Sequence, residues 1–387
     1  MKRKDINQQA FFELLRAGLW SDGNPDIRID GATDWQEVYR LATEQSVLGL
    51  VLDGLEHSTV KPPQILLLQW IGEVQVIEQR NKEMNAFVAE LIEKLRENDA
   101  DALLVKGQGV AQCYEKPLWR CSGDVDLFLS DSNYEIAKRV LVPLASEVET
   151  EYVGSKHLGM TIDGWVVELH GSLRVGLPNK INGVLDDIKS DTFNRGNMRS
   201  WMNGRTQVFL LGKENDIVYV FVHFFNHFYK EGVGLRQLCD WCRLMWTYRD
   251  EIDVKKIEGC IQEMGLVSEW KAFYNLASRY LGMPDLDSQD SQARMSDQRS
   301  SAGLTVHDSR FDKKADRIME FILKSGNMGH NRDMSHFSKY PYLIRKCVSM
   351  GRRISDLINH ARIFPLDSLR FFPRIMFNGV RSAIKGE

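Results

Sequence analysis

The stretch from residue 103 to residue 129 constrains the fold of this chain more than any other. It reads LLVKGQGVAQCYEKPLWRCSGDVDLFL, in which two short apolar runs flank a Lys-Gly pair and a segment that suits a short helix. Short apolar runs bounded by turn-forming residues are typical of buried strands. The second run carries Asp124 and Asp126, and side chains two residues apart on a strand share one face, about 6 to 7 Å apart along the backbone. The stretch therefore predicts two strands of one sheet, with two carboxylates converging on a small volume.

A third carboxylate is expected from a neighbouring strand. Downstream, the dipeptide Asp163-Gly164 separates two runs of strand-forming residues, which is a strong signal for a β-hairpin. The second arm of this hairpin places Glu168 and His170 on one face. We predict that Glu168 joins the two aspartates, and that His170 either orders the site or caps a sheet edge.

Three convergent carboxylates indicate metal-assisted phosphoryl transfer. Mg²⁺ prefers oxygen ligands and usually takes one or two carboxylates together with water and substrate phosphates. Asp124 and Asp126 could hold one ion, and with Glu168 they could hold a second ion about 3.5 to 4 Å away, so that attacking and leaving oxygens are clamped. Without metal the acids repel one another, and at least one of them should have a raised pKa. The expected cofactors are two Mg²⁺ ions, which Mn²⁺ could replace.

Helical patterns surround this core. Residues 64–98 carry apolar side chains at helical spacing, and a second helical series begins at Glu214. The segment 284–312 is rich in Ser, Asp and Gln, a composition typical of linkers. We predict an α+β fold, a small mixed β-sheet flanked by N-terminal and C-terminal helical regions. The expected parts are an N-terminal helical region (1–100), an α/β core (101–212), a helical domain (213–283), a polar linker or mobile loop (284–312) and a basic helical C-terminal region (313–387).

The net charge of −3 conceals an asymmetry along the chain. From Lys313 to the end there are 15 Lys and Arg against 6 Asp and Glu, so the preceding residues carry a net charge of −12. Three interpretations of this basic tail stay open: phosphate contacts with nucleic acid, peripheral membrane contact, or docking on the acidic body or a partner. The acidic body favours docking and disfavours a nucleic-acid polymerase.

Six cysteines in 387 residues are too sparse for a disulfide framework. The first residues lack the apolar core and cleavage site of a secretory signal, and no apolar stretch is long enough to span a bilayer. We therefore expect a cytoplasmic protein without a transmembrane segment.

The order of these motifs resembles the uncharacterised nucleotidyltransferase family of the DNA polymerase β-like superfamily, from about Trp35 to about Gly329. The matching motifs are Lys106-Gly107, a helix, Arg120-x-x-Gly-Asp-x-Asp, and a strand with Glu168-x-His170. In that superfamily an acidic triad on two strands binds metal for nucleotidyl transfer. The resemblance implies that Asp124 and Asp126 are catalytic metal ligands, and that Glu168 is the third ligand or the base for the acceptor hydroxyl.

One departure from the superfamily concerns the triphosphate. The superfamily commonly has Gly-Ser on the helix after the first strand, where this chain has Lys106-Gly107-Gln108. Lys106 could replace the lost contact as a point charge, assisted by backbone N–H groups at the helix start. Arg120 is a second candidate for a phosphate oxygen. The predicted nucleotide-binding residues are Lys106, Gly107, Arg120 and Gly123.

The expected function is that of a Mg²⁺-dependent enzyme. It would move an NMP group from a nucleoside triphosphate to an acceptor, with a small molecule favoured and a protein or RNA as alternatives. The rival class is a non-catalytic protein that retains the fold and binds a nucleotide or a partner, which the missing serine favours.

Two further patterns suggest ordinary packing. His223 and His227 have a zinc-chelating spacing but lack the glutamate of a metalloprotease helix, and Cys239 and Cys242 lie in a helical run without a second such pair. Lys230 and Arg236, which flank the glycine-bearing turn at 231–234, could approach a substrate from the helical domain.

Overall fold

The computed structural model describes residues 3–20, 27, 29–152, 154, 156–230, 232–286, 304, 307–327, 351, 355, 357–366 and 368–371. The predicted linker at 284–312 lies mostly outside the described residues. The basic and aromatic run at 339–353, apart from residue 351, and most of the second run, 369–377, also lie outside them. The interpretations of these tail motifs therefore stay predictions.

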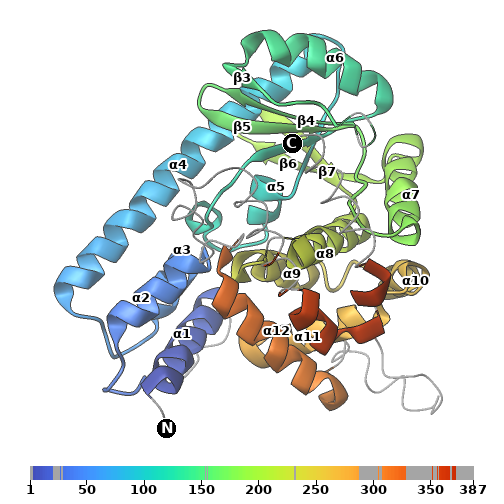
Figure 1. Ribbon diagram of the computed structural model, residues 1–387. Helices are drawn as coiled ribbons and strands as arrows, with labels where there is room; N and C mark the ends of the chain where they lie inside the picture. The colour runs from blue at the N-terminus through green and yellow to red at the C-terminus, as the bar shows by residue number, and fades with distance from the viewer. Residues whose placement is uncertain are drawn as a thin grey trace.

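Seven strands form one mixed sheet in the order β3-β4-β5-β2-β1-β7-β6. The two strands predicted from residues 103–129 are central: β2 pairs antiparallel with β1 and parallel with β5. Helices lie at both ends and on both faces of the sheet, which confirms the predicted α+β fold (Figure 1). The strands are β1 (Leu103–Val105), β2 (Val125–Phe128), β3 (Glu147–Val148), β4 (His157–Ile162), β5 (Trp165–His170), β6 (Met198–Asn203) and β7 (Thr206–Leu211).

The predicted hairpin is confirmed as β4 and β5. Ile162 pairs with Trp165 across the two-residue turn. Asp163 and Gly164 have φ values of +50° and +80°, and positive φ at both central residues is what a tight hairpin turn of this hand requires. The register continues along both strands, so that His157 lies opposite His170.

Alternate residues of the central strands enter two different cores, because side chains on a strand point to opposite faces. Leu104, Leu127 and Leu169 belong to the core that contains the C-terminal half of α4 and the helix α6. Leu103 and Phe128 belong to the larger core built with the C-terminal helices. Asp126 shares the face of Phe128, so the acidic side chains face the C-terminal helices.

The N-terminal region is helical, as predicted. Asp34 caps α2 by accepting a hydrogen bond from the backbone N–H of Gln36. The long helix α4 begins after Pro62-Pro63 and runs along one side of the molecule to the sheet (Figure 1). The helices up to the end of the core are α1 (Arg3–Leu19), α2 (Trp35–Glu44), α3 (Leu48–Glu56), α4 (Gln64–Arg96), α5 (Gly107–Ala111), α6 (Asp131–Leu141) and α7 (Asn179–Arg195).

The C-terminal helices form a second layer below the sheet in Figure 1. The helical series predicted from Glu214 onward includes a break at Gly265, which has a φ of +72° that favours glycine. Between the hairpin and this layer, α7, β6 and β7 are elements that were not predicted individually. The helices of the layer are α8 (Lys213–Lys230), α9 (Leu235–Thr247), α10 (Val254–Met264), α11 (Val267–Leu281) and α12 (Asp312–Ser325).

The described parts of the basic C-terminal region pack on this layer. The His360 ring lies 4.5 Å from that of Phe228, and the Phe371 ring lies 5.0 Å from that of Tyr229, measured between ring centroids. Among the described residues, no helix has the length and apolar character needed to cross a membrane.

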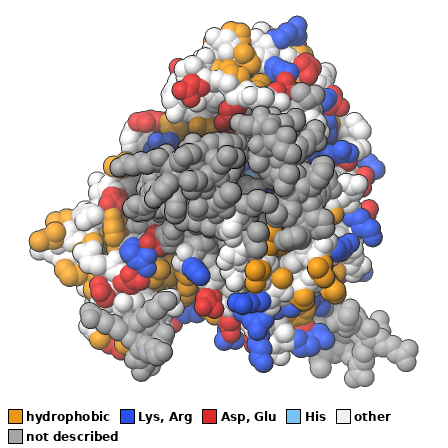
Figure 2. Space-filling model, in the orientation of Figure 1, with side chains coloured by type: hydrophobic (Ala, Val, Ile, Leu, Met, Phe, Trp, Pro, Cys, Tyr) orange, Lys and Arg blue, Asp and Glu red, His pale blue; other side chains and the backbone are white. Residues whose placement is uncertain are grey.

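Hydrophobic side chains gather at the left edge of Figure 2, over the N-terminal half of α4. Ile65, Leu68 and Val76 are exposed there. This half of α4 projects beyond the sheet, which explains why its outer face is not covered.

Candidate active site

Three carboxylates converge where β2 and β5 lie side by side. Asp126 on β2 is in register with Glu168 on β5, and Asp124 immediately precedes β2. Because the two strands are adjacent and parallel, paired residues point to the same face. One carboxylate oxygen of each residue lies within 4.8 Å of the others. The predicted convergence is confirmed.

The buried carboxylate of Asp126 contacts two nitrogen atoms, one from a lysine and one from a histidine. The Lys106 Nζ lies 2.7 Å and the His170 Nε2 lies 2.9 Å from its Oδ1. Burial acts to lower the pKa of Lys106, but attraction to Asp126 and the neighbouring acids raises it overall. Lys106 therefore keeps its positive charge and partly neutralises the acidic cluster.

The other two acids have opposite pKa shifts. Burial, together with repulsion by Asp126 and Glu168, raises the pKa of Asp124, as predicted for at least one member of the cluster. Burial also acts to raise the pKa of Glu168, but hydrogen bonds with His157 and His170 outweigh it and lower the pKa. Glu168 is therefore ionised before a cation arrives, whereas ionisation of Asp124 is coupled to cation binding.

Two histidines lie beside Glu168. The Nε2 atoms of His157 and His170 lie 3.1 and 3.3 Å from the same oxygen, Oε2. His157 was not among the predicted site residues. The signal was present in the sequence, because counting back from the turn at Asp163-Gly164 places His157 opposite His170.

The backbone at Lys106 is strained. Lys106 has φ +58° and ψ −146°, a region that residues with a side chain rarely adopt, and Gly107 follows with φ +44°. This turn ends β1, and a Cβ on Gly107 would lie 3.6 Å from the backbone oxygen of Asp124. The Lys106 Nζ also lies 3.4 Å from His223 Nε2 on α8, so the helical layer reaches the site.

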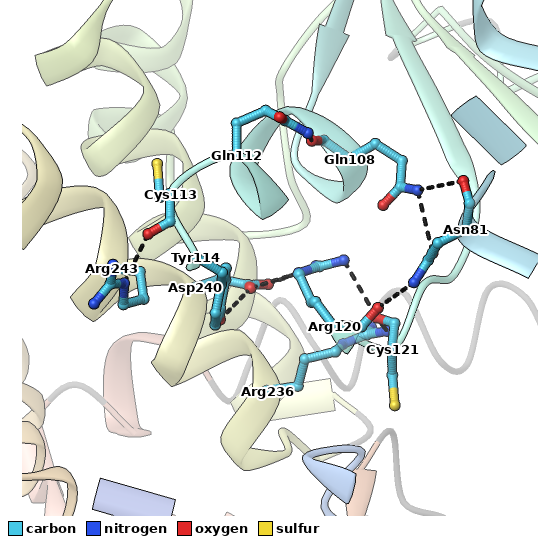
Figure 3. Close-up of polar contacts among 10 residues, drawn as sticks. All are labelled: Asn81, Gln108, Gln112, Cys113, Tyr114, Arg120, Cys121, Arg236, Asp240 and Arg243. Atoms are coloured by element: carbon cyan, nitrogen blue, oxygen red, sulfur yellow. Dashed lines mark hydrogen bonds and ion pairs between the residues drawn. The ribbon is translucent and has the colours of Figure 1, made fainter. Parts of the chain in front are cut away.

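Arg120 does not join the acidic cluster. Its Nε and Nη2 each donate a 2.7 Å hydrogen bond to Asp240 of α9, and both side chains are buried (Figure 3). Tyr114 donates a third hydrogen bond to this carboxylate, also at 2.7 Å. The interaction attaches the segment before Asp124 to the helical layer. A contact between Arg120 and a phosphate stays a prediction.

Gln108, at the position of the superfamily serine, is buried and faces α4. Its amide nitrogen donates to the side-chain oxygen of Asn81 at 3.1 Å (Figure 3). It also donates to the side-chain oxygen of Asn85 at 2.9 Å. Asn81 in turn donates to the backbone oxygens of Leu118 and Arg120. The side chain at this position therefore supports the loop that leads to Asp124.

Replacing Gln108 by serine should destabilise the protein rather than improve nucleotide binding. The shorter side chain leaves the buried Asn81 oxygen without its donor, and an unsatisfied buried polar group costs about 1–3 kcal/mol. We expect a loss of this size in the free energy of unfolding, measured by urea denaturation. Gln79→Ser, on the exposed side of α4, is the control and should change it by about 0.5 kcal/mol or less. Tighter nucleotide binding by a fully stable Gln108→Ser variant would contradict this role.

Arg236 of α9 stands beside Gly123. Its Nη1 donates a 2.9 Å hydrogen bond to the backbone oxygen of Cys121. Its guanidinium nitrogens lie 3.8 and 3.9 Å from the position that a Cβ of Gly123 would occupy. Burial and the nearby Arg120 lower the pKa of Arg236, although the group stays cationic. The Nε atom is buried and has no hydrogen-bond partner among the residues that the structure describes. Arg236 therefore places a positive charge beside residues 121–123, which immediately precede Asp124.

The two remaining motifs lie on α8 and α9 of the helical layer. The rings of His223 and His227 lie 4.6 Å apart, and neither belongs to a group of three metal-ligating side chains within the described part of the chain. Cys239 and Cys242 are free and buried, and burial raises the pKa of both thiols. They are therefore poor nucleophiles.

A family model described as an uncharacterised nucleotidyltransferase matches residues 31–282. The match includes the whole sheet, the carboxylates and the helices from α2 to α11. No curated protein and no solved structure matches the chain.

Proposed function

Because the chain belongs to the family of uncharacterised nucleotidyltransferases, we propose that it moves an NMP group from a nucleoside triphosphate to an acceptor by a two-metal mechanism. The observation that carries this proposal is the convergence of Asp124, Asp126 and Glu168 within 4.8 Å. Side chains held by two adjacent strands are well suited to a site that must keep its geometry through a reaction.

The donor set fits a hard divalent cation. Asp124, Asp126 and Glu168 would all bind a cation through carboxylate oxygens. Asp124 is partly exposed, so water and phosphates can complete the coordination. These residues would hold Mg²⁺, or Mn²⁺ in its place. When bound, such ions supply charge stabilisation for the triphosphate and for the attacking and leaving oxygens.

Lys106 is the proposed phosphate ligand of the core. Its raised pKa keeps the ammonium charged, and its strained backbone holds it at the end of β1 beside the carboxylates. Gly107, in the turn after β1, and Gly123, in the loop before Asp124, place no side chains beside the three carboxylates. Arg236 is in a position to add a second positive charge beside Gly123. Arg120 could contribute only after releasing Asp240.

Glu168 could be either the third metal ligand or the base for the acceptor hydroxyl, and the role of metal ligand is favoured. Its lowered pKa makes the carboxylate a ready ligand but a weak proton acceptor, since an effective general base has a pKa near the working pH. The acceptor hydroxyl therefore requires another proton acceptor, such as solvent or a phosphate oxygen.

The other expectations from the sequence stay part of the proposal. We assign catalysis to the core, residues 101–212, closed by the helical domain 213–283. The acceptor is proposed to be a small molecule, and the place of action the cytoplasm. The contact between Lys106 and His223 supports closure by the helical domain.

A second candidate is a non-catalytic protein that binds nucleotide or a partner on the same fold. Two observations favour it: Gln108 is used for internal hydrogen bonds, and Asp240 engages Arg120. Arg120, a predicted phosphate ligand, and the side chain at the position of the superfamily serine are thus both engaged in other contacts.

Nucleotide binding should depend on a divalent cation. We expect calorimetric titration of the purified chain with ATP, CTP, GTP and UTP to show binding of at least one nucleotide with Mg²⁺, and none after EDTA treatment, because the acids repel an uncompensated triphosphate. Pyrophosphate release should follow the same dependence. Metal-independent binding without pyrophosphate release would favour the second candidate.

A further inference from the structure

A second group of metal-ligating side chains adjoins the three carboxylates. It consists of His157 on β4 and of Glu168 and His170 on β5, and one ligand atom of each lies within 4.8 Å of the others. The two Nε2 atoms approach a single oxygen, Glu168 Oε2, at 3.1 and 3.3 Å. This group contains nitrogen donors, unlike the set formed by Asp124, Asp126 and Glu168.

We propose that His157, Glu168 and His170 form a centre for a transition-metal ion of the Mn²⁺, Co²⁺ or Zn²⁺ class, joined to the all-oxygen Mg²⁺ site through the shared Glu168. The inference rests on the proposed function and deepens it, because the two ions of the site would then differ in kind. Imidazole ligands suit transition metals, whereas Mg²⁺ prefers oxygen.

The two separations between the nitrogen donors and the Glu168 oxygen fit one ion. Nitrogen and oxygen ligands bind zinc at about 2.0 to 2.2 Å, so that neighbouring ligands of a tetrahedral ion lie about 3.3 Å apart. The two observed separations, 3.1 and 3.3 Å, agree with this value. Three protein ligands leave a fourth position for water or substrate, which is typical of catalytic sites.

The backbone holds the centre in place. His157 and His170 are directly paired in the β4–β5 ladder, and Glu168 is also paired to Asp126 across β2. Their side chains therefore converge without any loop movement. The side chains of His157 and Glu168 are 24% and 26% exposed, so the centre is open to an incoming ion on one side.

The charges around the centre also favour a cation. Asp126 borders it, with Oδ1 2.9 Å from His170 Nε2, and Asp124 lies within the adjoining cluster. The nearby positive charge, Lys106, is bonded to Asp126 rather than to His157 or Glu168. Within the described part of the chain, the three carboxylates outnumber the one ammonium group that forms an ion pair with them, that of Lys106.

Cobalt provides a direct test, because Co²⁺ bound through nitrogen in a four- or five-coordinate site absorbs visible light more strongly than Co²⁺ in six-coordinate oxygen sites. EDTA-treated full-length protein is titrated with Co²⁺ in excess Mg²⁺, which keeps the oxygen site occupied. We expect about one equivalent of Co²⁺ per protein to bind and to give the strong visible absorption of a four- or five-coordinate site. His157→Ala should weaken this binding at least about 10-fold, since even loss of a residue that supports a metal ligand costs 10- to 100-fold.

The control is His57→Ala, which removes an exposed histidine at the end of α3 and should change neither affinity nor spectrum. His157→Gln, with circular dichroism of every variant, separates loss of a ligand from loss of the fold. Equal Co²⁺ affinity and spectrum in the parent and both His157 variants, or a weak six-coordinate spectrum in the parent, would overturn the inference.

Asp124→Asn distinguishes failure of the inference from failure of the proposed function. Its side chain belongs to the oxygen site alone, so it should lose Mg²⁺-dependent nucleotide turnover while keeping the intense Co²⁺ spectrum. Retained turnover in Asp124→Asn would refute the proposed function and leave the metal centre standing. If Asp124→Asn loses turnover but His157→Ala leaves the Co²⁺ spectrum unchanged, the metal centre is refuted and the proposed function is not.

Discussion

Asp124→Asn is expected to lower Mg²⁺-dependent nucleotide turnover at least about 1,000-fold, equivalent to about 4 kcal/mol of transition-state stabilisation. The amide has the shape of the carboxylate but lacks the negative charge that a hard cation requires. Steady-state pyrophosphate release, measured at saturating Mg²⁺ and nucleotide, gives the effect. Turnover equal to that of the parent would show that the three carboxylates are not the catalytic site.

The same substitution should not destabilise the fold. Burial and the neighbouring acids raise the pKa of Asp124, so its charge opposes folding at neutral pH. We therefore expect an unchanged or slightly higher free energy of unfolding. Asp126→Asn is the contrasting variant: it also abolishes turnover, but it leaves the charge of Lys106 without its buried partner, and breaking such a pair costs about 3–5 kcal/mol.

Arg120→Ala is expected to destabilise the protein by about 3–5 kcal/mol in urea denaturation. The substitution leaves the buried Asp240 carboxylate without its bidentate partner, and removing one member of a buried ion pair costs this much. Replacing both residues by leucine should recover part of the loss, because apolar side chains can fill such a position without burying a charge.

An exposed ion pair provides the matched control. Arg174 and Asp186 make an equally close contact, at 2.6 Å, but their side chains are 52% and 40% exposed. Arg174→Ala should cost about 1 kcal/mol or less, because water screens surface pairs. An Arg120→Ala variant with normal stability and weakened triphosphate binding would instead support the predicted role of Arg120 as a phosphate ligand.

The arrangement of Asp124, Asp126 and Glu168 could be predicted because it depends on short-range patterns. The apolar runs on either side of Lys106-Gly107 identify two strands, and Asp163-Gly164 sets the register of the hairpin that carries Glu168. The same register, carried back five residues from the turn, predicts that His157 lies opposite His170. That step needed no tertiary information, although His157 was not predicted.

The partners of three other residues could not be obtained from such patterns. Gln108 stands at the position of the superfamily serine, and its side chain bonds to α4, more than twenty positions earlier in the chain. Arg120 looked available for a phosphate, but its partner, Asp240, lies 120 positions away. Arg236 was noted only as a side chain that could approach the substrate, and it stands beside Gly123.

Residues 103–129 and the hairpin turn were thus enough to identify the strands, the convergence of the acids and the face on which they lie, because strand periodicity and turn chemistry act over a few residues. Packing of the long helix α4 and of α9 against this stretch determines which of its polar side chains stay available to a ligand. A buried polar group must find a partner, and that partner is selected by the packing of distant elements, which local sequence does not encode.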